Sequence, residues 1–171
     1  MPNYTRALFA GGTWFFTAVT DGRSPWLAEP LAVRCLTNAL RAVRRRHPFG
    51  MDALVVLPDH VHAIWRLPPG DTLFSLRWEL VKKHCNERLR QLDVAAPRPA
   101  WQPRFWEHLI RDDSDFEAHV DYVHFNPVKH GLVAAPCDWA WSSFHRYVAA
   151  GVYTNDWAAS PRETKALAKG E

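Results

Sequence analysis

Two short motifs hold residues that can do chemistry together: His60-Val61-His62, and Tyr122 with Asn126 on its C-terminal side. In a strand, alternate residues share a face, so His60 and His62 would point both imidazoles the same way. In a helix, residues four apart share a face, so Tyr122 and Asn126 would project together. Imidazole and amide oxygen are ligands for divalent ions such as Mg²⁺ or Mn²⁺. The pattern predicts a metal site on one element and a tyrosine nucleophile on another.

The chemistry that suits this set is phosphodiester transesterification. A phenol has a pKa of about 10, so Tyr122 is a poor nucleophile unless the reaction centre is strongly activated. A metal that polarises a phosphate oxygen supplies that activation. Attack would form a phosphotyrosine bond and release a sugar hydroxyl, which can later reverse the reaction. Taken alone, the histidine pair is more typical of a structural strand, and Tyr122 is more typical of a helix tyrosine half-buried at the edge of the core. Only their combination favours this function.

Local patterns predict the elements that must position these residues. Aromatic and β-branched runs between turn residues predict strands over 13–20, 53–57, 60–67 and 104–110. Helical spacing predicts one helix around 36–43 and a second one capped by Asp71 or Thr72. A capping box of Ser114 and Glu117 begins a third helix, which we expect to end near Asn126 because Pro127 disfavours helical geometry before it.

The order of these elements predicts an α+β fold, a ferredoxin-like βαββαβ sandwich with an added C-terminal helix that carries the tyrosine. In the strand 60–67, Val61, Ala63, Trp65 and Leu67 would face the helices, and the two histidines would face away from them. We expect one domain over residues 1–150 and a loosely ordered C-terminal tail over 151–171.

The composition favours an ordered globular protein. The chain has 171 residues, of which 47% are hydrophobic and 13% aromatic, and no apolar run approaches the length of a membrane span. Three widely spaced cysteines show no metal-binding or redox pair, which is typical of reduced thiols. We therefore expect a cytoplasmic protein. Clusters of basic residues at 41–46 and 82–90 suit a nucleic acid, although a solvated helix face is an equal alternative.

Several longer segments resemble a known family. The strings LPDHVHAIWRLP, RFWEHLIRDDSDFEAHVDYVHFNPVKHGLV and DWAWSSFHRYV, with the opening GGTWFFTAVT, are similar to the single-tyrosine HUH transposases, specifically the REP-associated tyrosine transposases. The resemblance covers residues 6–148. It implies metal ligation by His60, His62 and Asn126, with Mg²⁺ or Mn²⁺ as cofactor and Tyr122 as the nucleophile. It further implies cleavage and rejoining of single-stranded DNA beside an imperfect palindromic hairpin, through a 5′-phosphotyrosine intermediate and a free 3′-hydroxyl.

Predicted DNA contacts come from two sources. In the family, the N-terminal segment helps to recognise a short guide sequence, which implies contacts by Arg6, Gly11, Gly12 and Thr13. Basic residue types add Arg77, Lys82, Lys83 and Arg146, with Trp78 nearby as a stacking surface. Among the remaining histidines, we interpret His119 and His124 as satisfied or solvated residues, and His108 with Glu107 as an outer support of the metal site.

Two other functions stay open from the sequence. One is a hairpin-binding protein without catalytic activity, and the other is a two-histidine phosphoesterase in which water attacks. The oligomeric state is also open, because related enzymes act as monomers or as homodimers that exchange the tyrosine helix.

Overall fold

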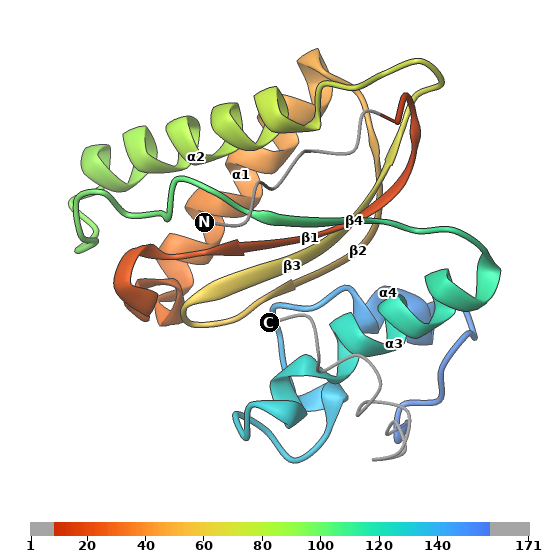
Figure 1. Cartoon of the computed structure of the whole chain (residues 1–171). Helices are drawn as coiled ribbons and strands as arrows, with labels where there is room; N and C mark the ends of the chain where they lie inside the picture. Colours follow the sequence, from red (N-terminus) through yellow and green to blue (C-terminus); the bar gives the residue numbers. More distant parts are fainter. Residues whose placement is uncertain (1–8, 158–171) are drawn as a thin grey trace.

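A four-stranded antiparallel sheet is the centre of the fold. The computed structural model describes residues 9–157, and its strands lie in the order β2-β3-β1-β4 (Figure 1). The strands are β1 (Gly12–Val19), β2 (Gly50–Val56), β3 (His60–Leu67) and β4 (Trp106–Leu109). All three neighbouring pairs are antiparallel, with Thr17 of β1 opposite His62 of β3.

Helices cover both faces of this sheet. The long helices α1 (Pro30–Arg46) and α2 (Phe74–Gln91) lie on one face, and α3 (Asp113–Lys129) lies on the other with α4 (Phe144–Ala149) beside it (Figure 1). Short 3-10 turns occur at η1 (Asp21–Arg23), η2 (Trp26–Ala28) and η3 (Pro136–Asp138). The order βαββαβ followed by a helix confirms the predicted fold class. Within the described residues, no helix is both long and apolar enough to cross a membrane.

Strand β3 has the bounds that its alternation predicts. Its residues Val61, Ala63, Trp65 and Leu67 belong to the core under α1 and α2, as expected. Three other strands differ at their ends: β1 begins one residue earlier, β2 begins at Gly50 and β4 is shorter than the predicted strand. Residues 50–52 extend β2 beyond the predicted strand. The pairing of β2 with β3 shifts register between Met51 and Ala53, which lets these extra residues pair with β3.

The predicted caps of two helices are wrong. Helix α2 begins at Phe74, and Asp71 instead accepts a hydrogen bond from the backbone N–H of Leu73 at 2.7 Å in the preceding turn. At α3 the N-cap is Asp112, whose carboxylate accepts from the N–H of Asp115 at 2.8 Å. Ser114 is exposed in the first turn of α3. The cap is displaced because the chain leaving β4 enters the helix two residues before Ser114.

Pro127 does not end α3, contrary to the sequence prediction. The helix continues to Lys129, and the N–H of His130 still donates to the carbonyl of Asn126 at 3.0 Å. Both Asn126 and Pro127 are buried against the rest of the molecule. Packing of this segment therefore outweighs the local preference of a proline for breaking the helix.

Residues 151–157, the first part of the predicted tail, include a side chain that packs against the domain. The Tyr153 hydroxyl donates to Asp121 Oδ1 at 2.6 Å, and its ring stacks on Phe144 with 5.3 Å between centroids. The ordered domain therefore extends past the predicted boundary at residue 150. The predicted loose tail otherwise falls on residues 158–171, which lie outside the described part.

Candidate active site

The two histidines of the HVH motif lie together at the start of β3. His60 and His62 are 2% and 0% exposed, and their ring centroids are 4.8 Å apart. Nδ1 of His60 lies 2.6 Å from Oδ1 of Asp59, and Nδ1 of His62 lies 2.8 Å from Oγ1 of Thr17. Each ring is thus anchored through Nδ1, which directs Nε2 away from its anchor. This is the arrangement in which an outer residue fixes the tautomer of a ligating histidine.

Asp59 is a charged anchor at neutral pH. Burial raises the pKa of its carboxyl, but the hydrogen bonds from His60 and Arg23 outweigh burial, so that the pKa lies below its usual value. The carboxylate can therefore accept a hydrogen bond from Nδ1–H of His60, the tautomer in which Nε2 carries the lone pair.

One face of α3 packs against this histidine pair. The Tyr122 ring lies 5.2 Å from the His62 ring, and the His130 ring lies 5.0 Å from the His60 ring, measured between centroids. Asn126 lies one helical turn from both Tyr122 and His130, so it shares the face that carries these two contacts with the histidines. The structure therefore brings together His60, His62, Tyr122 and Asn126, which are far apart in the sequence.

The buried donor atoms at this point fit a divalent ion. Asn126 is 0% exposed, and within the described residues neither its Oδ1 nor its Nδ2 has a hydrogen-bond partner. The same holds for Nε2 of His60. Buried polar atoms without partners are costly, and such a group indicates a ligand or an ion that completes it. Two imidazoles and an amide oxygen form a donor set that suits Mg²⁺ or Mn²⁺.

Lys129 is a site residue that sequence reasoning missed. Its Nζ donates to the Tyr122 hydroxyl at 3.2 Å and lies 4.8 Å from the centre of the Tyr122 ring. The ammonium group thus places positive charge beside the oxygen expected to attack. Lys129 follows Tyr122 by two helical turns, so the spacing alone could have placed both on one helix face. This holds only because the helix continues through Pro127.

The predicted N-terminal DNA contacts fall in a tight turn. Arg6 lies outside the described residues. Gly11 and Gly12 both have φ of +82°, and a Cβ on Gly11 would meet the Pro68 carbonyl oxygen at 3.1 Å. The glycines are therefore required by the backbone, whatever they contact. Thr13 is half-buried in β1, opposite Arg66 of β3.

Arg77 does not support the predicted DNA contact. Its side chain is 3% exposed, and its guanidinium donates to both carboxylate oxygens of Asp71, at 2.8 and 2.6 Å. It also donates to the backbone carbonyls of His47 and Pro48. Neighbouring Trp78 is buried and stacks on Trp65, with 4.5 Å between ring centroids. Both residues hold α2 to the body of the protein.

The other predicted basic contacts occupy different surroundings. Lys82 is half-buried and its Nζ donates to the carbonyl of Gln102 at 2.7 Å, whereas Lys83 is exposed. Arg146 is exposed on α4, and its guanidinium donates to the Met51 carbonyl of β2 at 3.1 Å. Lys82 and Lys83 are on α2 and Arg146 is on α4, and their contact with DNA stays a prediction.

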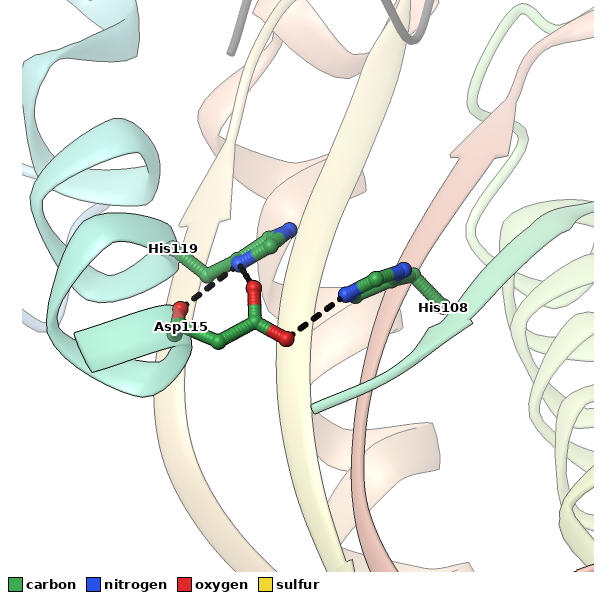
Figure 2. A group of neighbouring side chains, drawn as sticks. All are labelled: His108, Asp115 and His119. Atoms are coloured by element: carbon green, nitrogen blue, oxygen red, sulfur yellow. Dashed lines mark hydrogen bonds and ion pairs between the residues drawn. The ribbon is translucent and has the colours of Figure 1, made fainter. Parts of the chain in front are cut away.

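A second cluster contains His108, Asp115 and His119, close to the first turn of α3 (Figure 2). One potential ligand atom from each residue lies within 4.8 Å of the others. However, the two imidazole rings stack, with 15° between their planes and 4.7 Å between centroids. An ion must lie near the plane of each ring that coordinates it, and stacked planes do not meet at a common point. We therefore describe His108, Asp115 and His119 as a polar clamp that joins β4 to α3.

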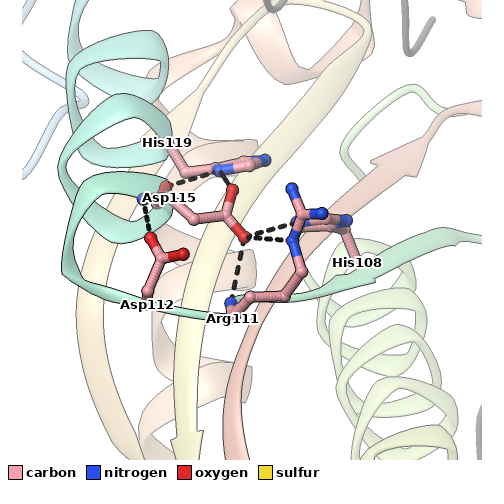
Figure 3. A network of polar contacts seen from close by, with 5 residues as sticks. All are labelled: His108, Arg111, Asp112, Asp115 and His119. Carbon is pink, nitrogen blue, oxygen red and sulfur yellow. Dashed lines mark hydrogen bonds and ion pairs between the residues drawn. The ribbon is translucent and has the colours of Figure 1, made fainter.

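Asp115 is the centre of this clamp (Figure 3). His108 Nε2 and His119 Nδ1 each lie 3.0 Å from a different oxygen of its carboxylate, and the backbone N–H of Arg111 donates to it at 3.0 Å. Burial raises the pKa of Asp115, but these hydrogen bonds outweigh burial and lower the pKa to about 2. The charged carboxylate ties the end of β4 to the start of α3.

The clamp corrects one interpretation and explains another histidine. His108 faces Asp115 and not the HVH pair, while Glu107 points to the opposite face of β4, so they are not an outer support of the predicted metal site. Phe15 connects His119 to the predicted active site, because its ring centroid lies 5.0 Å from the His119 ring and 5.9 Å from the Tyr122 ring. Burial lowers the pKa of His119.

His124 is a buried, satisfied histidine, as expected. It is 0% exposed, and its Nε2 lies 2.8 Å from Oγ of Ser143, which also accepts from the N–H of Leu54 at 2.9 Å. Burial, with smaller contributions from Arg146 and His145, lowers the pKa of His124 to about 3. The neutral ring thus joins α3 to β2 through the Ser143 hydroxyl.

Comparisons with known proteins support the same family. No protein-family model matches the chain. It is 46% identical over 158 residues to the REP-associated tyrosine transposase of Escherichia coli K12, covering 92% of both chains. A Haemophilus influenzae protein named for the same family is 38% identical over 170 residues, covering 94% of this chain and 96% of the relative. The solved structure of a REP-associated tyrosine transposase bound to a REP hairpin has a TM-score of 0.83 and 45% identity, covering 94% of this chain and 93% of that one. The chain therefore belongs to the REP-associated tyrosine transposases, a family of HUH-type transposase enzymes.

Proposed function

We propose that this transposase cleaves and rejoins single-stranded DNA at imperfect palindromic hairpins, with Tyr122 as its nucleophile. The observation that carries the proposal is the packing of the Tyr122 ring on His62, with buried Asn126 one turn away and both histidines anchored through Nδ1. The solved relative was bound to a REP hairpin, which supports a hairpin substrate for this chain as well.

The reaction would exchange one phosphodiester bond for another. The Tyr122 oxygen forms a bond to the phosphorus, and the bond from the phosphorus to the 3′ oxygen breaks. The products are a 5′-phosphotyrosine and a free 3′-hydroxyl, which can attack the same linkage in reverse. One P–O bond forms for each that breaks, so no nucleotide or other energy source is needed.

The chain's own residues have separate tasks in this reaction. His60, His62 and Asn126 would hold Mg²⁺ or Mn²⁺, which supplies polarisation of the phosphate and offsets its developing charge. Asp59 and Thr17 keep the two imidazoles in one orientation. Lys129 stabilises negative charge on the Tyr122 oxygen, 3.2 Å away. Tyr122 packs on His62 of its own chain, which supports a site that is complete in a monomer.

The test is detection of the covalent intermediate. A labelled oligonucleotide that contains the palindromic repeat flanking the gene is incubated with the protein and Mg²⁺ or Mn²⁺, and adducts are separated on denaturing gels. We expect the wild type to form an adduct and Tyr122→Phe to form none. Tyr147→Phe is the control, because Tyr147 is a half-buried tyrosine whose hydroxyl donates to the Asp52 carbonyl, whereas the Tyr122 ring packs on His62.

Other results would identify the alternatives. An adduct that survives Tyr122→Phe would overturn the assignment of the nucleophile. Cleavage without any adduct, retained in Tyr122→Phe, would indicate a phosphoesterase that uses water. Hairpin binding without cleavage in either metal would indicate a binding protein that has lost catalysis.

A further inference from the structure

A groove of about 480 Å³ lies beside the β2 edge of the sheet, away from the histidine pair. One wall is formed by α1, and the other by the segment 140–146. Met51, Leu54 and Val56 of β2 line it as well. Its volume lies within the range of sites that bind ligands of moderate size.

The second wall is fixed by backbone pairing with β2. The N–H of Val56 donates to the Trp141 carbonyl at 2.9 Å, and the N–H of Ser143 donates to the Leu54 carbonyl at 2.8 Å. Ser142 forms an isolated antiparallel bridge with Val55. The groove therefore has two walls held by regular structure, and its shape does not depend on an unsupported loop.

The charge in the groove is entirely positive. Three arginines line it, Arg34 and Arg41 from α1 and Arg146 from α4, and no acidic residue belongs to its lining within the described part of the chain. Arg34 and Arg41 are exposed and lie two helical turns apart, and neither has an ion pair with a carboxylate among residues 9–157. Positive groups gathered in a concave site attract a polyanion strongly.

The remaining lining supplies polar donors and one aromatic wall. Asn38 and Ser142 carry side chains that can donate to phosphate oxygens, whereas the Thr37 hydroxyl donates to the Arg34 carbonyl at 3.2 Å. Trp141 adds a half-buried indole. Guanidinium groups with hydroxyl and amide donors are the combination that holds a nucleic-acid backbone, and an indole provides an apolar surface for sugar or base.

Strand β2, which lines the groove, leads along the chain to the predicted catalytic histidines. Val56, at one end of its floor, is followed by the turn 57–59 and then by His60, and the N–H of Leu57 donates to the His60 carbonyl at 2.9 Å. A DNA strand bound along β2 would therefore approach the turn that carries Asp59.

We propose that this groove binds the phosphate backbone of the hairpin DNA and holds the hairpin beside the strand that is cut. The inference rests on the proposed function, because it assigns a second contact surface to the same substrate. Arg34, Arg41 and Arg146 pair with successive phosphates, and the hydroxyl and amide groups of the walls fix their spacing. Contacts to phosphate position the DNA without reading its sequence.

The test compares two double variants of α1. In Arg34→Gln/Arg41→Gln both groove arginines of the helix are removed, and in Arg45→Gln/Arg46→Gln two exposed arginines outside the groove lining are removed. Binding to a labelled hairpin oligonucleotide is measured by fluorescence anisotropy at several salt concentrations. We expect the groove variant to raise Kd by roughly 10- to 100-fold and to reduce the slope of log Kd against log salt by about two.

The matched variant should change Kd less than about threefold, because both variants remove the same charge and only one removes it from the groove. Circular dichroism checks that both are folded. A groove variant with the Kd and salt slope of the wild type would overturn the proposal. Equal losses in the two variants would also overturn it, since the effect would then come from net charge.

Adduct formation separates this proposal from the catalytic one. If the groove is correct, the groove variant needs more DNA for half-maximal adduct formation, and Tyr122→Phe binds the hairpin with the wild-type Kd. If the wild type forms no adduct but the groove variant still binds weakly, the groove stands and the catalytic proposal fails. If the wild type forms an adduct and the groove variant binds normally, the groove fails alone.

Discussion

The two faces of the central sheet use the same strands for opposite purposes. On the α1 and α2 side, Trp65 of β3 packs against Phe16, Phe49 and Trp78, with ring centroids 4.3 to 4.9 Å apart. On the α3 side, the neighbouring positions of the same strand carry buried histidines anchored by polar groups. One face buries mainly apolar surface, although the indole nitrogens of Trp65 and Trp78 have no hydrogen-bond partner among residues 9–157. The other face buries polar groups, and Nε2 of His60 and the Asn126 amide likewise have no partner among these residues.

The difference teaches how a small domain can hold unpartnered polar groups in place. Buried polar atoms without partners destabilise a fold, and burial of aromatic side chains stabilises it. Strand alternation places the two contributions one residue apart, so the aromatic face fixes the backbone from which the histidines project. Changes on one face should therefore alter stability, and changes on the other should alter ligand binding.

The largest expected effect is on the aromatic face. Trp65→Ala removes a side chain that is 0% exposed and leaves a cavity between β3 and α2, so we expect a loss of about 3 to 5 kcal/mol in the free energy of unfolding. Urea denaturation measures this loss. Arg66→Ala is the adjacent control on the opposite face. Arg66 is 65% exposed and forms a surface ion pair with Asp52, so we expect a change within about 1 kcal/mol. Similar losses in both variants would contradict the division between faces.

An intermediate effect is expected from the anchor of His62. Thr17→Val keeps the shape of the side chain but removes the hydroxyl that lies 2.8 Å from Nδ1, so the ring loses its fixed tautomer. We expect Mn²⁺ affinity, measured by titration calorimetry, to fall by roughly 10- to 100-fold. Thr13→Val, on the same face of β1, is the control and should leave the affinity unchanged. Unaltered Mn²⁺ binding in Thr17→Val would show that His62 needs no such anchor.

The smallest effect is expected at the clamp. Asp115→Asn removes the charge that accepts from His108 and the Arg111 N–H and lies 3.0 Å from His119 Nδ1, and we expect a loss of about 1 to 2 kcal/mol at pH 7. Because the folded pKa of about 2 is lower than the unfolded value, the charge stabilises the fold fully above pH 4. This stabilisation disappears as the pH falls towards 2.

Denaturation at several pH values checks the clamp prediction. The stabilities of the wild type and Asp115→Asn should differ between pH 5 and 7 and converge towards pH 2. Asp113→Asn removes the same charge from the same helical turn without touching the histidines, and it should change stability by less than about 0.5 kcal/mol. A constant difference between wild type and Asp115→Asn at all pH values would rule out the titration of Asp115 as its source.

Much of the fold and the grouping of site residues could be predicted from the sequence, because they depend on local periodicity. The alternation of 60–67 predicts both the strand and its two faces, and the spacing of Tyr122 and Asn126 places them on one helix face. Those signals are contained within single elements, where backbone geometry alone decides which side chains share a face.

The features that were missed depend on tertiary contacts. Lys129 was missed because the helix was predicted to end before Pro127. Lys129 lies on the same side of α3 as Tyr122 only when the helix continues through this proline. An arginine on a helix is usually a surface residue that is available to bind DNA. Arg77 is buried because Asp71 and two backbone carbonyls accept hydrogen bonds from its guanidinium. The choice of Asp112 as cap over Ser114 likewise depends on where the chain leaves β4, which no local pattern specifies.

The pairing of the segment 141–143 with β2 has a consequence for association between molecules. An open edge strand presents unpaired N–H and C=O groups to which another chain can add, and this is a common route to aggregation. Here the β2 edge already hydrogen-bonds to that segment, and β4 at the opposite edge is only four residues long. Neither outer strand offers a long template for intermolecular strand addition. The two edges of the sheet are thus protected against strand addition by other molecules.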